Sequence, residues 1–276
     1  IIEDELDKMR DLGVTFQTDT IVGKTITYED LKAQGMDGIF IATGVGVANY
    51  MGIPGEDLKG VYTASEYLAK YNLMSPEDLA EALPSLRGKR VAVIGGGNTA
   101  IDAVRTAIRL DAKQATIVYR RSEEEMPARA EEIKHAREEG TEFFNLHNPV
   151  EYLGDESGHV TAMRLERMEL GAPDESGRRR PVATGEIITV PVDEVIICIG
   201  YSASTLVTKS MPELEVNKWG NIVVDEGKKT SMPDVYAGGD IVRGAATVIL
   251  AMGDGRRAAT AMHQKLSGRI EEGALV

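Results

Sequence analysis

Residues 91–104, VAVIGGGNTAIDAV, decide the fold. An apolar run leads into Gly95, Gly97 and Ala100, spaced G-x-G-x-x-A, and a stretch with helical periodicity follows. In such a unit the first glycine allows a tight turn, the second lets a pyrophosphate approach the backbone, and the third position must be small so that helix and strand pack closely. The amides at the helix start favour phosphate. The stretch predicts a dinucleotide site; the alternative is a glycine-rich structural turn.

The end of the next apolar run indicates which dinucleotide is bound. The segment TIVYRRS places Arg120 and Arg121 where an NAD-binding unit usually carries an acid for the ribose hydroxyls. Guanidinium groups only donate hydrogen bonds, and they suit a 2′-phosphate. The sequence therefore favours NADP over NAD. The alternative is a solvated pair bridged to Glu123, Glu124 and Glu125, although these glutamates are expected to cap a helix that starts near Pro127.

Helical and strand patterns alternate on both sides of this unit, which predicts an α/β fold with parallel strands. Thr27 is expected to cap one of the helices. Helices are expected at 1–12, 27–34, 75–89 (a short helix and loop), 98–112, 127–140 and 247–266, and strands at 14–20, 36–44, 90–96, 114–120 and 141–148. From about 150 to 192 the pattern predicts an antiparallel meander that leads back to a parallel strand. Residues 220–242 suggest hairpin-like strands, and the arginines of the 176–185 loop are expected to be solvated.

A second constellation lies in residues 235–259, VYAGGDIVRGAATVILAMGDGRRAA. A strand ends at Gly239 and Asp240, and a helix opens at 246–248. An aspartate at a strand end can accept hydrogen bonds from a polyol, and a helix N-terminus stabilises negative charge on a flavin. Alone, the stretch also fits an ordinary strand–loop–helix. Two further strands end in small residues where a cofactor could press on the backbone, at Thr43 and Gly44 and at Gly200.

Taken in order, FIATG, VIGGGNTAIDAVRTA, VYRRSEEEMPA, ICIG and the 235–259 stretch resemble the flavoprotein reductases with two dinucleotide-binding domains, above all the NADPH-dependent glutamate synthase small (beta) subunit family. The resemblance implies two Rossmann-like domains of the glutathione-reductase type, with an NADP domain inserted in an FAD domain. It also implies hydride transfer from NADPH to FAD, followed by electron transfer to iron–sulfur clusters and a partner.

The resemblance also implies roles for particular residues. Because the cofactors perform the chemistry, no catalytic residue and no metal ligand is expected in this chain. The pyrophosphate of NADPH would be held by Gly95, Gly97, Asn98, Thr99 and Ala100, its 2′-phosphate by Arg120 and Arg121, the FAD ribityl chain by Asp240, and the flavin ring by Ala246, Thr247 and Val248, with Thr43, Gly44, Gly200 and Gly239 lining the cofactor paths.

The sequence departs from the family in lacking its cysteine-rich iron–sulfur domain and the first G-x-G-x-x-G that grips FAD. Because it opens at Ile1 inside a helical pattern, a fragment is expected. The expected domains are 1–59 (first FAD segment), 60–203 (NADP domain) and 204–276 (last FAD segment). FAD affinity should be weak or absent, and the fragment should be inactive alone.

Composition restricts the alternatives. A net charge of −13 argues against nucleic acid or an anionic membrane as partner, and the four histidines show no metal-ligand spacing. Cys198 is the single cysteine, expected in the core, which excludes a redox-active cysteine pair and suits the cytoplasm. The expected partner is the glutamate synthase large subunit or another electron acceptor, and a homo-oligomer stays open. The alternatives are a ferredoxin–NADP oxidoreductase subunit, a dihydropyrimidine-dehydrogenase-type reductase subunit, and a non-catalytic NADP-binding module.

Overall fold

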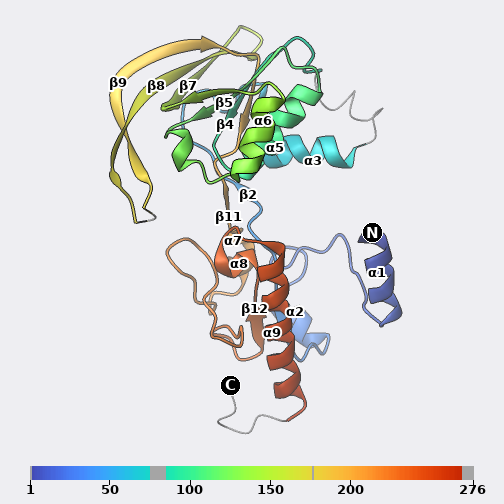
Figure 1. The fold of residues 1–276 in the computed structure, drawn as a ribbon. Helices are drawn as coiled ribbons and strands as arrows, with labels where there is room; N and C mark the ends of the chain where they lie inside the picture. Colours follow the sequence, from blue (N-terminus) through green and yellow to red (C-terminus); the bar gives the residue numbers. More distant parts are fainter. Residues whose placement is uncertain (1, 75–84, 176, 269–276) are drawn as a thin grey trace. The chain divides into compact units, whose positions relative to one another are not determined.

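The computed structural model describes residues 2–74, 85–175 and 177–268 (Figure 1). The chain forms two compact units: unit 1 comprises residues 1–47 and 201–276, and unit 2 comprises residues 48–200. Unit 2 is therefore inserted between two segments of unit 1, with boundaries somewhat earlier in the chain than those expected from the sequence. At the crossings, β2 (Val47–Ala48) and β11 (Tyr201–Ser202) pair as a two-stranded sheet.

Unit 2 is built on a five-stranded parallel sheet with the strand order β3-β10-β4-β5-β6. The strands are β3 (Val61–Thr63), β10 (Glu194–Ile197), β4 (Arg90–Ile94), β5 (Gln114–Tyr119) and β6 (Glu142–Asn145). The helices are α3 (Ala64–Leu73), α5 (Asn98–Arg109) and α6 (Ala130–Glu138), and η1 (Glu123–Glu125) is a short 3₁₀ turn. The predicted α/β class is confirmed.

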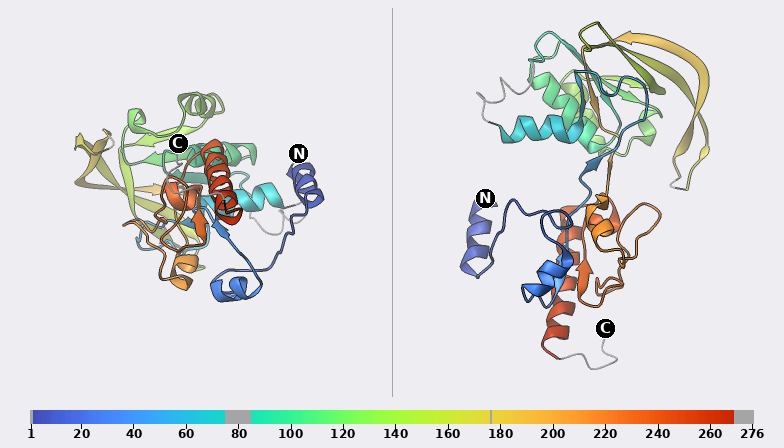
Figure 2. Two further views of the ribbon diagram at one scale, coloured as in Figure 1. Left: turned by 90° about the horizontal axis from the view of Figure 1, so that it is seen from below. Right: turned by 180° about the vertical axis from the view of Figure 1, so that it is seen from behind.

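The apolar run of β4 explains why the sheet is covered on both faces. Val91 and Val93 pack into the cluster formed with α3, α5 and α6, whereas Ala92 and Ile94 pack into the cluster formed with the antiparallel strands. Alternate residues of a strand point to opposite faces, so a continuous apolar run needs two covers. Burying one such valine side chain contributes about 1.5–3 kcal/mol. Figures 1 and 2 show the helices on one face of the sheet and β7–β9 on the other.

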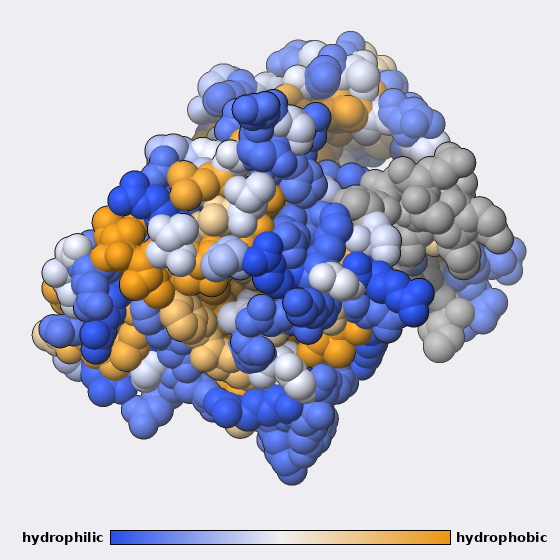
Figure 3. Space-filling view, turned by 90° about the horizontal axis from the view of Figure 1, so that it is seen from above, coloured by the Kyte–Doolittle hydropathy of each residue, from blue (hydrophilic) through white to orange (hydrophobic). Residues whose placement is uncertain are grey.

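The second cover is the predicted antiparallel meander. It consists of β7 (His147–Gly154), β8 (Val160–Pro173) and β9 (Arg179–Pro191), in the order β7-β8-β9. Tyr152 and Leu165 from this sheet are buried against the parallel sheet. Val182 and Ile187 of β9 are exposed. Figure 3 shows hydrophobic residues gathered on part of the surface that is seen from above. The meander is thus a structural layer with a partly apolar outer surface.

Unit 1 has a much smaller sheet, in which β1 (Ile39–Ile41) pairs in parallel with β12 (Val235–Ala237). Its helices are α1 (Ile2–Asp11), α2 (Tyr28–Ala33), α7 (Thr205–Ser210), α8 (Asp240–Arg243) and α9 (Val248–Leu266). Thr27 begins α2 as predicted: its hydroxyl accepts from the Asp30 amide, and the Asp30 carboxylate accepts from the Thr27 amide. This capping box satisfies donors at the helix start.

One strand prediction in unit 1 is wrong, and another is confirmed only in part. Residues 14–20 form no strand; Val14 and Phe16 are exposed and find no strand to pair with among the described residues. In residues 220–242 the one regular strand is β12, whose Tyr236 makes an antiparallel bridge with Lys229, as in a hairpin. Ile222 makes an isolated bridge with Val216. Strand patterns need a paired neighbour, which local sequence cannot supply. The short helix predicted within 75–89 falls largely outside the described residues.

Candidate functional site

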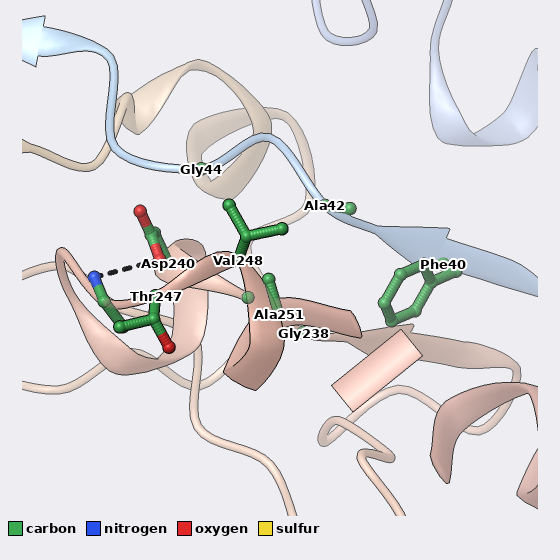
Figure 4. A pocket seen from close by; sticks show the side chains of 10 residues that line it. Phe40, Ala42, Gly44, Gly238, Asp240, Thr247, Val248 and Ala251 are labelled. Atoms are coloured by element: carbon green, nitrogen blue, oxygen red, sulfur yellow. Dashed lines mark hydrogen bonds between the residues drawn. The ribbon is translucent and has the colours of Figure 1, made fainter. Parts of the chain in front are cut away.

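Unit 1 contains a cavity of about 260 Å³ between the ends of β1 and β12 and the start of α9 (Figure 4). Its wall is made largely of small residues, which leave the backbone accessible. The lining residues are Phe40, Ala42, Gly44, Gly238, Gly239, Asp240, Ala246, Thr247, Val248 and Ala251. The structure thus brings together Gly44, Gly239, Asp240, Ala246, Thr247 and Val248 of the expected FAD residues, whereas Thr43 is not part of the lining.

The strand end at β12 is shaped by two glycines. A Cβ at Gly238 would lie 2.8 Å from Asp254 Cβ and 2.9 Å from Phe40 Cζ, so only glycine fits between β1 and α9. Gly239 has φ +74°, which favours glycine. This turn places Asp240 at the cavity, where its Oδ1 accepts from the Ala246 amide over 3.2 Å (Figure 4). The carboxylate therefore links the strand end to the loop before α9.

The helix α9 opens directly at the cavity. Thr247 is its N-cap, and the Thr247 hydroxyl accepts from the Leu250 amide over 3.4 Å. Val248 and Ile249 in its first turn are 75% and 79% exposed. In Figure 4 Val248 lies between the start of α9 and the end of β1. A helix N-terminus flanked by exposed apolar side chains suits a planar, partly apolar ligand that carries negative charge.

A buried ionic network, which the sequence did not reveal, holds the turn at Gly239 and Asp240 in place. The Asp254 side chain is fully buried, and its Oδ2 accepts from the Gly239 amide (3.1 Å) and from Arg243 Nε (2.6 Å). Lys228 Nζ lies 2.9 Å from Asp254 Oδ1. Hydrogen bonding to Arg243, with help from Lys228, holds the pKa of Asp254 well below its usual range. Asp254 thereby fixes the turn that carries Asp240.

The glycine-rich turn of unit 2 meets each requirement of the predicted fingerprint. Gly95 has φ +141°, and a Cβ there would lie 2.3 Å from the Cys198 carbonyl oxygen. A Cβ at Gly97 would meet nothing within 4 Å, so this glycine leaves the space above the turn open. Ala100 is fully buried, which allows α5 to pack closely on β4. Gly95 is therefore required by the packing of the turn, and Gly97 leaves the backbone of the turn accessible.

The start of α5 is open toward the same space. Gly97 is its N-cap and provides no side-chain cap, and the first turn holds no acidic residue. Asn98 is exposed and Thr99 partly exposed. Free amides and the helix dipole therefore present partial positive charge to a phosphate.

The two arginines at the end of β5 have different environments. Arg120 is exposed, and its guanidinium has no partner among the described residues. Arg121 is buried: its Nε donates to the Arg179 carbonyl oxygen (2.8 Å), and its Nη2 donates to Asp174 Oδ2 (2.8 Å). The predicted matched pair is therefore one free guanidinium and one guanidinium that ties β5 to the end of the β8–β9 hairpin.

The glutamates that follow do not pair with Arg120 or Arg121, and they do not cap α6, whose N-cap is Arg129. Arg179 instead donates to Glu124 over 2.8 Å and forms an ion pair with the buried Glu125. The expectation that all arginines of the 176–185 loop are solvated is therefore wrong. These contacts span more than fifty residues of sequence, so no local signal announces them.

Gly200 and Cys198 complete the sequence-predicted positions of unit 2. Gly200 has φ +94°, and its carbonyl oxygen accepts from the Asn49 amide over 3.1 Å. Cys198 is buried in the core as expected, and burial raises the pKa of its thiol well above the usual range. Within residues 2–74, 85–175 and 177–268, no group of three or more His, Cys, Asp or Glu side chains could hold a metal ion. No helix in that part of the chain has the length and apolar character needed to cross a membrane.

One unit has a glycine-rich strand–turn–helix, and the other has a cavity lined by small residues at a helix start. Together these features define a dinucleotide-dependent oxidoreductase fold. Residues 5–263 match the family described as pyridine nucleotide-disulphide oxidoreductase, and the chain belongs to this family. The chain has one cysteine, so the cysteine pair of the family's disulfide-reducing members is not formed within it.

Named relatives show which members of the family this chain resembles. The chain is 41% identical over 270 residues to the NADP(+)-dependent formate dehydrogenase subunit beta of Moorella thermoacetica, covering 96% of this chain and 37% of that protein. It is 38% identical over 257 residues to the glutamate synthase (NADPH) small chain of Escherichia coli, covering 90% of this chain and 54% of that protein. The resemblance to the glutamate synthase small-subunit group is thus confirmed, and the chain spans about half or less of these relatives.

Among solved structures, Mycobacterium tuberculosis FprA in complex with NADPH superimposes with a TM-score of 0.75 at 20% identity. The match covers 98% of this chain and 74% of FprA. At this identity the likeness supports the fold alone.

Proposed function

We propose that this chain is the nucleotide-handling part of an NADPH:FAD oxidoreductase of the glutamate synthase small-subunit type. The observation that carries the proposal is the open, uncapped start of α5 above Gly97, with the unpartnered Arg120 at the end of the adjacent strand. In this assignment the amides of 97–99 hold the pyrophosphate and Arg120 holds the 2′-phosphate. Ala100, which the sequence also assigned to the pyrophosphate, is fully buried and its amide donates to the Gly97 carbonyl oxygen over 3.0 Å, so it serves packing. Arg121 supports this edge through Asp174.

We propose that the cavity of unit 1 takes the flavin end of FAD, with the weak affinity expected from the sequence. Asp240 would accept hydrogen bonds from the ribityl hydroxyls, and the start of α9 at 246–248 would face the flavin ring. When both cofactors are bound, they supply hydride transfer from the dihydronicotinamide to the flavin. The chain's own residues bind and orient the two cofactors, and no side chain is assigned as an acid or base.

We further propose that electrons leave through iron–sulfur clusters in other parts of the protein and pass to a partner. In the glutamate synthase family this partner is the large subunit. Similarity to several glutamate synthase small chains at 37–38% identity supports this partner class. A second candidate is electron exchange between NADP and a formate dehydrogenase, favoured by the 41% identity to a subunit of that name. In either role this chain alone is expected to lack turnover.

The test is a titration of the purified protein with NADPH and with NADH, beside Arg120→Ala. Wild type should bind NADPH at least about tenfold more tightly than NADH, and the variant should lose that preference while keeping its NADH affinity. A folded protein that binds neither nucleotide would refute the proposal. Equal affinities in wild type would refute the NADP assignment alone.

A further inference from the structure

Next to the glycine-rich turn lies a segment that the fingerprint does not include. Residues 126–129 run from η1 into α6, and Met126 and Ala128 anchor this segment in the core of unit 2. The Ala128 amide donates to the Gly96 carbonyl oxygen over 3.2 Å. The Arg129 amide donates to Asn98 Oδ1 over 3.0 Å. The backbone of Arg129 is therefore fixed directly beside the first residue of α5.

The Arg129 side chain, at the N-cap of α6, differs from the arginines within the helices of unit 2. The other arginines form ion pairs with glutamates: Arg105 with Glu132 and Glu139, Arg109 with Glu139, and Arg137 with Glu123. Arg129 is exposed, and its guanidinium makes no ion pair or hydrogen bond with any described residue. A long, unpaired cation is thus held by its backbone next to an uncapped helix start.

We infer that Arg129 binds the pyrophosphate of the nucleotide, together with the amides of the turn; this inference rests on the proposed function. A guanidinium presents two parallel donors that match two phosphate oxygens, which is the geometry of the strong charge-assisted pairs. Asn98 is the positioning residue: its oxygen accepts from the Arg129 amide and so holds α6 and α5 together at this point. Arg120 then binds the 2′-phosphate, and Arg129 binds the pyrophosphate.

This division has a distinct signature in binding. NADPH and NADH share the pyrophosphate, so Arg129→Ala should weaken both by about tenfold and leave their ratio unchanged. Adenosine 2′-monophosphate has the 2′-phosphate and no pyrophosphate, so its affinity should not change. Arg129→Lys keeps the charge without the fork and should fall between wild type and Arg129→Ala.

The matched control is Lys134→Ala, which removes one exposed cation from the same helix. It should leave all three affinities unchanged. The double variant Asn98→Ala, Arg129→Ala should lose less than the sum of the two single losses, because Asn98 acts in part through Arg129. Thermal unfolding of each variant checks that the fold is kept.

The outcomes separate the two proposals. If wild type binds NADPH and Arg129→Ala behaves like Lys134→Ala, the inference on Arg129 is wrong and the proposed function stands. If the loss is confined to NADPH and adenosine 2′-monophosphate, Arg129 belongs to the 2′-phosphate site and the pyrophosphate assignment is overturned. If wild type binds no nucleotide, the proposed function fails and the inference fails with it.

Discussion

Two helices in this chain, α5 in unit 2 and α9 in unit 1, begin near the glycines that follow a strand, yet they are packed very differently. Five residues of α5 are fully buried against the parallel sheet: Ala100, Ile101, Ala103, Val104 and Ala107. In α9 the buried residues are Asp254 and Ala258, and its first turn exposes Val248 and Ile249. A five-stranded sheet covers one face of a helix, whereas the three-residue pair β1–β12 cannot.

The difference teaches how each site is held in place. At α5 the geometry of the turn comes from close apolar packing, so the small residues are dictated by the fold. At α9 the turn is held by the charges of Asp254, Arg243 and Lys228 behind the cavity. The first site should respond most to added volume, and the second to lost charge.

The largest expected effect separates the two glycines of the α5 turn. Gly95→Ala should destabilise unit 2 by more than about 4 kcal/mol, because the new Cβ would overlap the Cys198 carbonyl oxygen at a φ of +141°. Gly97→Ala has open space for its Cβ and should cost less than about 1 kcal/mol. Urea unfolding of both variants measures this. Nucleotide titration should show that Gly97→Ala, although folded, binds NADPH at least about tenfold more weakly; unchanged binding would contradict the close approach of the pyrophosphate.

The second prediction concerns charge behind the unit 1 cavity. Asp254→Ala should lower the free energy of unfolding of unit 1 by about 3 kcal/mol, because Arg243 and Lys228 would lose the buried carboxylate that they share. Thermal or urea unfolding measures the loss. The control is Asp7→Ala, which removes an exposed ion pair with Arg10 in the same unit and should have little effect. Equal small effects would show that the network does not hold the turn.

The third prediction sharpens the contrast between neighbouring arginines. Arg121→Ala should destabilise unit 2 by about 2 kcal/mol, since it leaves Asp174 without this buried partner and frees the end of the β8–β9 hairpin. Arg120→Ala, at an exposed position, should leave the unfolding midpoint unchanged. Comparing the two melting curves tests the different roles. A larger loss for Arg120→Ala would contradict them.

The smallest effect is a pH dependence in unit 2. Hydrogen bonds from Arg105, with help from Arg109, lower the pKa of Glu139 from 4.5 to about 2. A lowered folded-state pKa contributes stability above pH 4.5 that disappears as the pH falls toward 2. Glu139→Gln should therefore be less stable than wild type at pH 7, with the gap closing between pH 4.5 and 2. Urea unfolding of wild type and Glu139→Gln at pH 7 and near pH 2 measures the difference in stability. Glu138→Gln, at an exposed position, should show no difference that closes as the pH falls.

Local rules predicted much of this protein from its sequence. The spacing of Gly95, Gly97 and Ala100, the threonine cap at Thr27, and the long C-terminal helix all depend on groups within a few residues of one another. The same holds for the apolar run of β4, which was predicted as a strand from its local pattern. These features survive in the structure because steric and capping requirements act within a single turn or strand.

Other features required the folded chain. Arg121 faces Asp174 and Arg179 faces Glu125 because the β8–β9 hairpin returns to the end of β5. Asp254 reaches Gly239 because α9 lies across the end of β12. Residues 14–20 have a strand-like pattern and yet form no strand, since no partner strand meets them among the described residues. The sequence by itself determined the glycine-rich turn and its helix, whose chemistry is local; tertiary structure decided which charges stay free to bind a ligand, because ion pairs depend on residues that are distant in the chain.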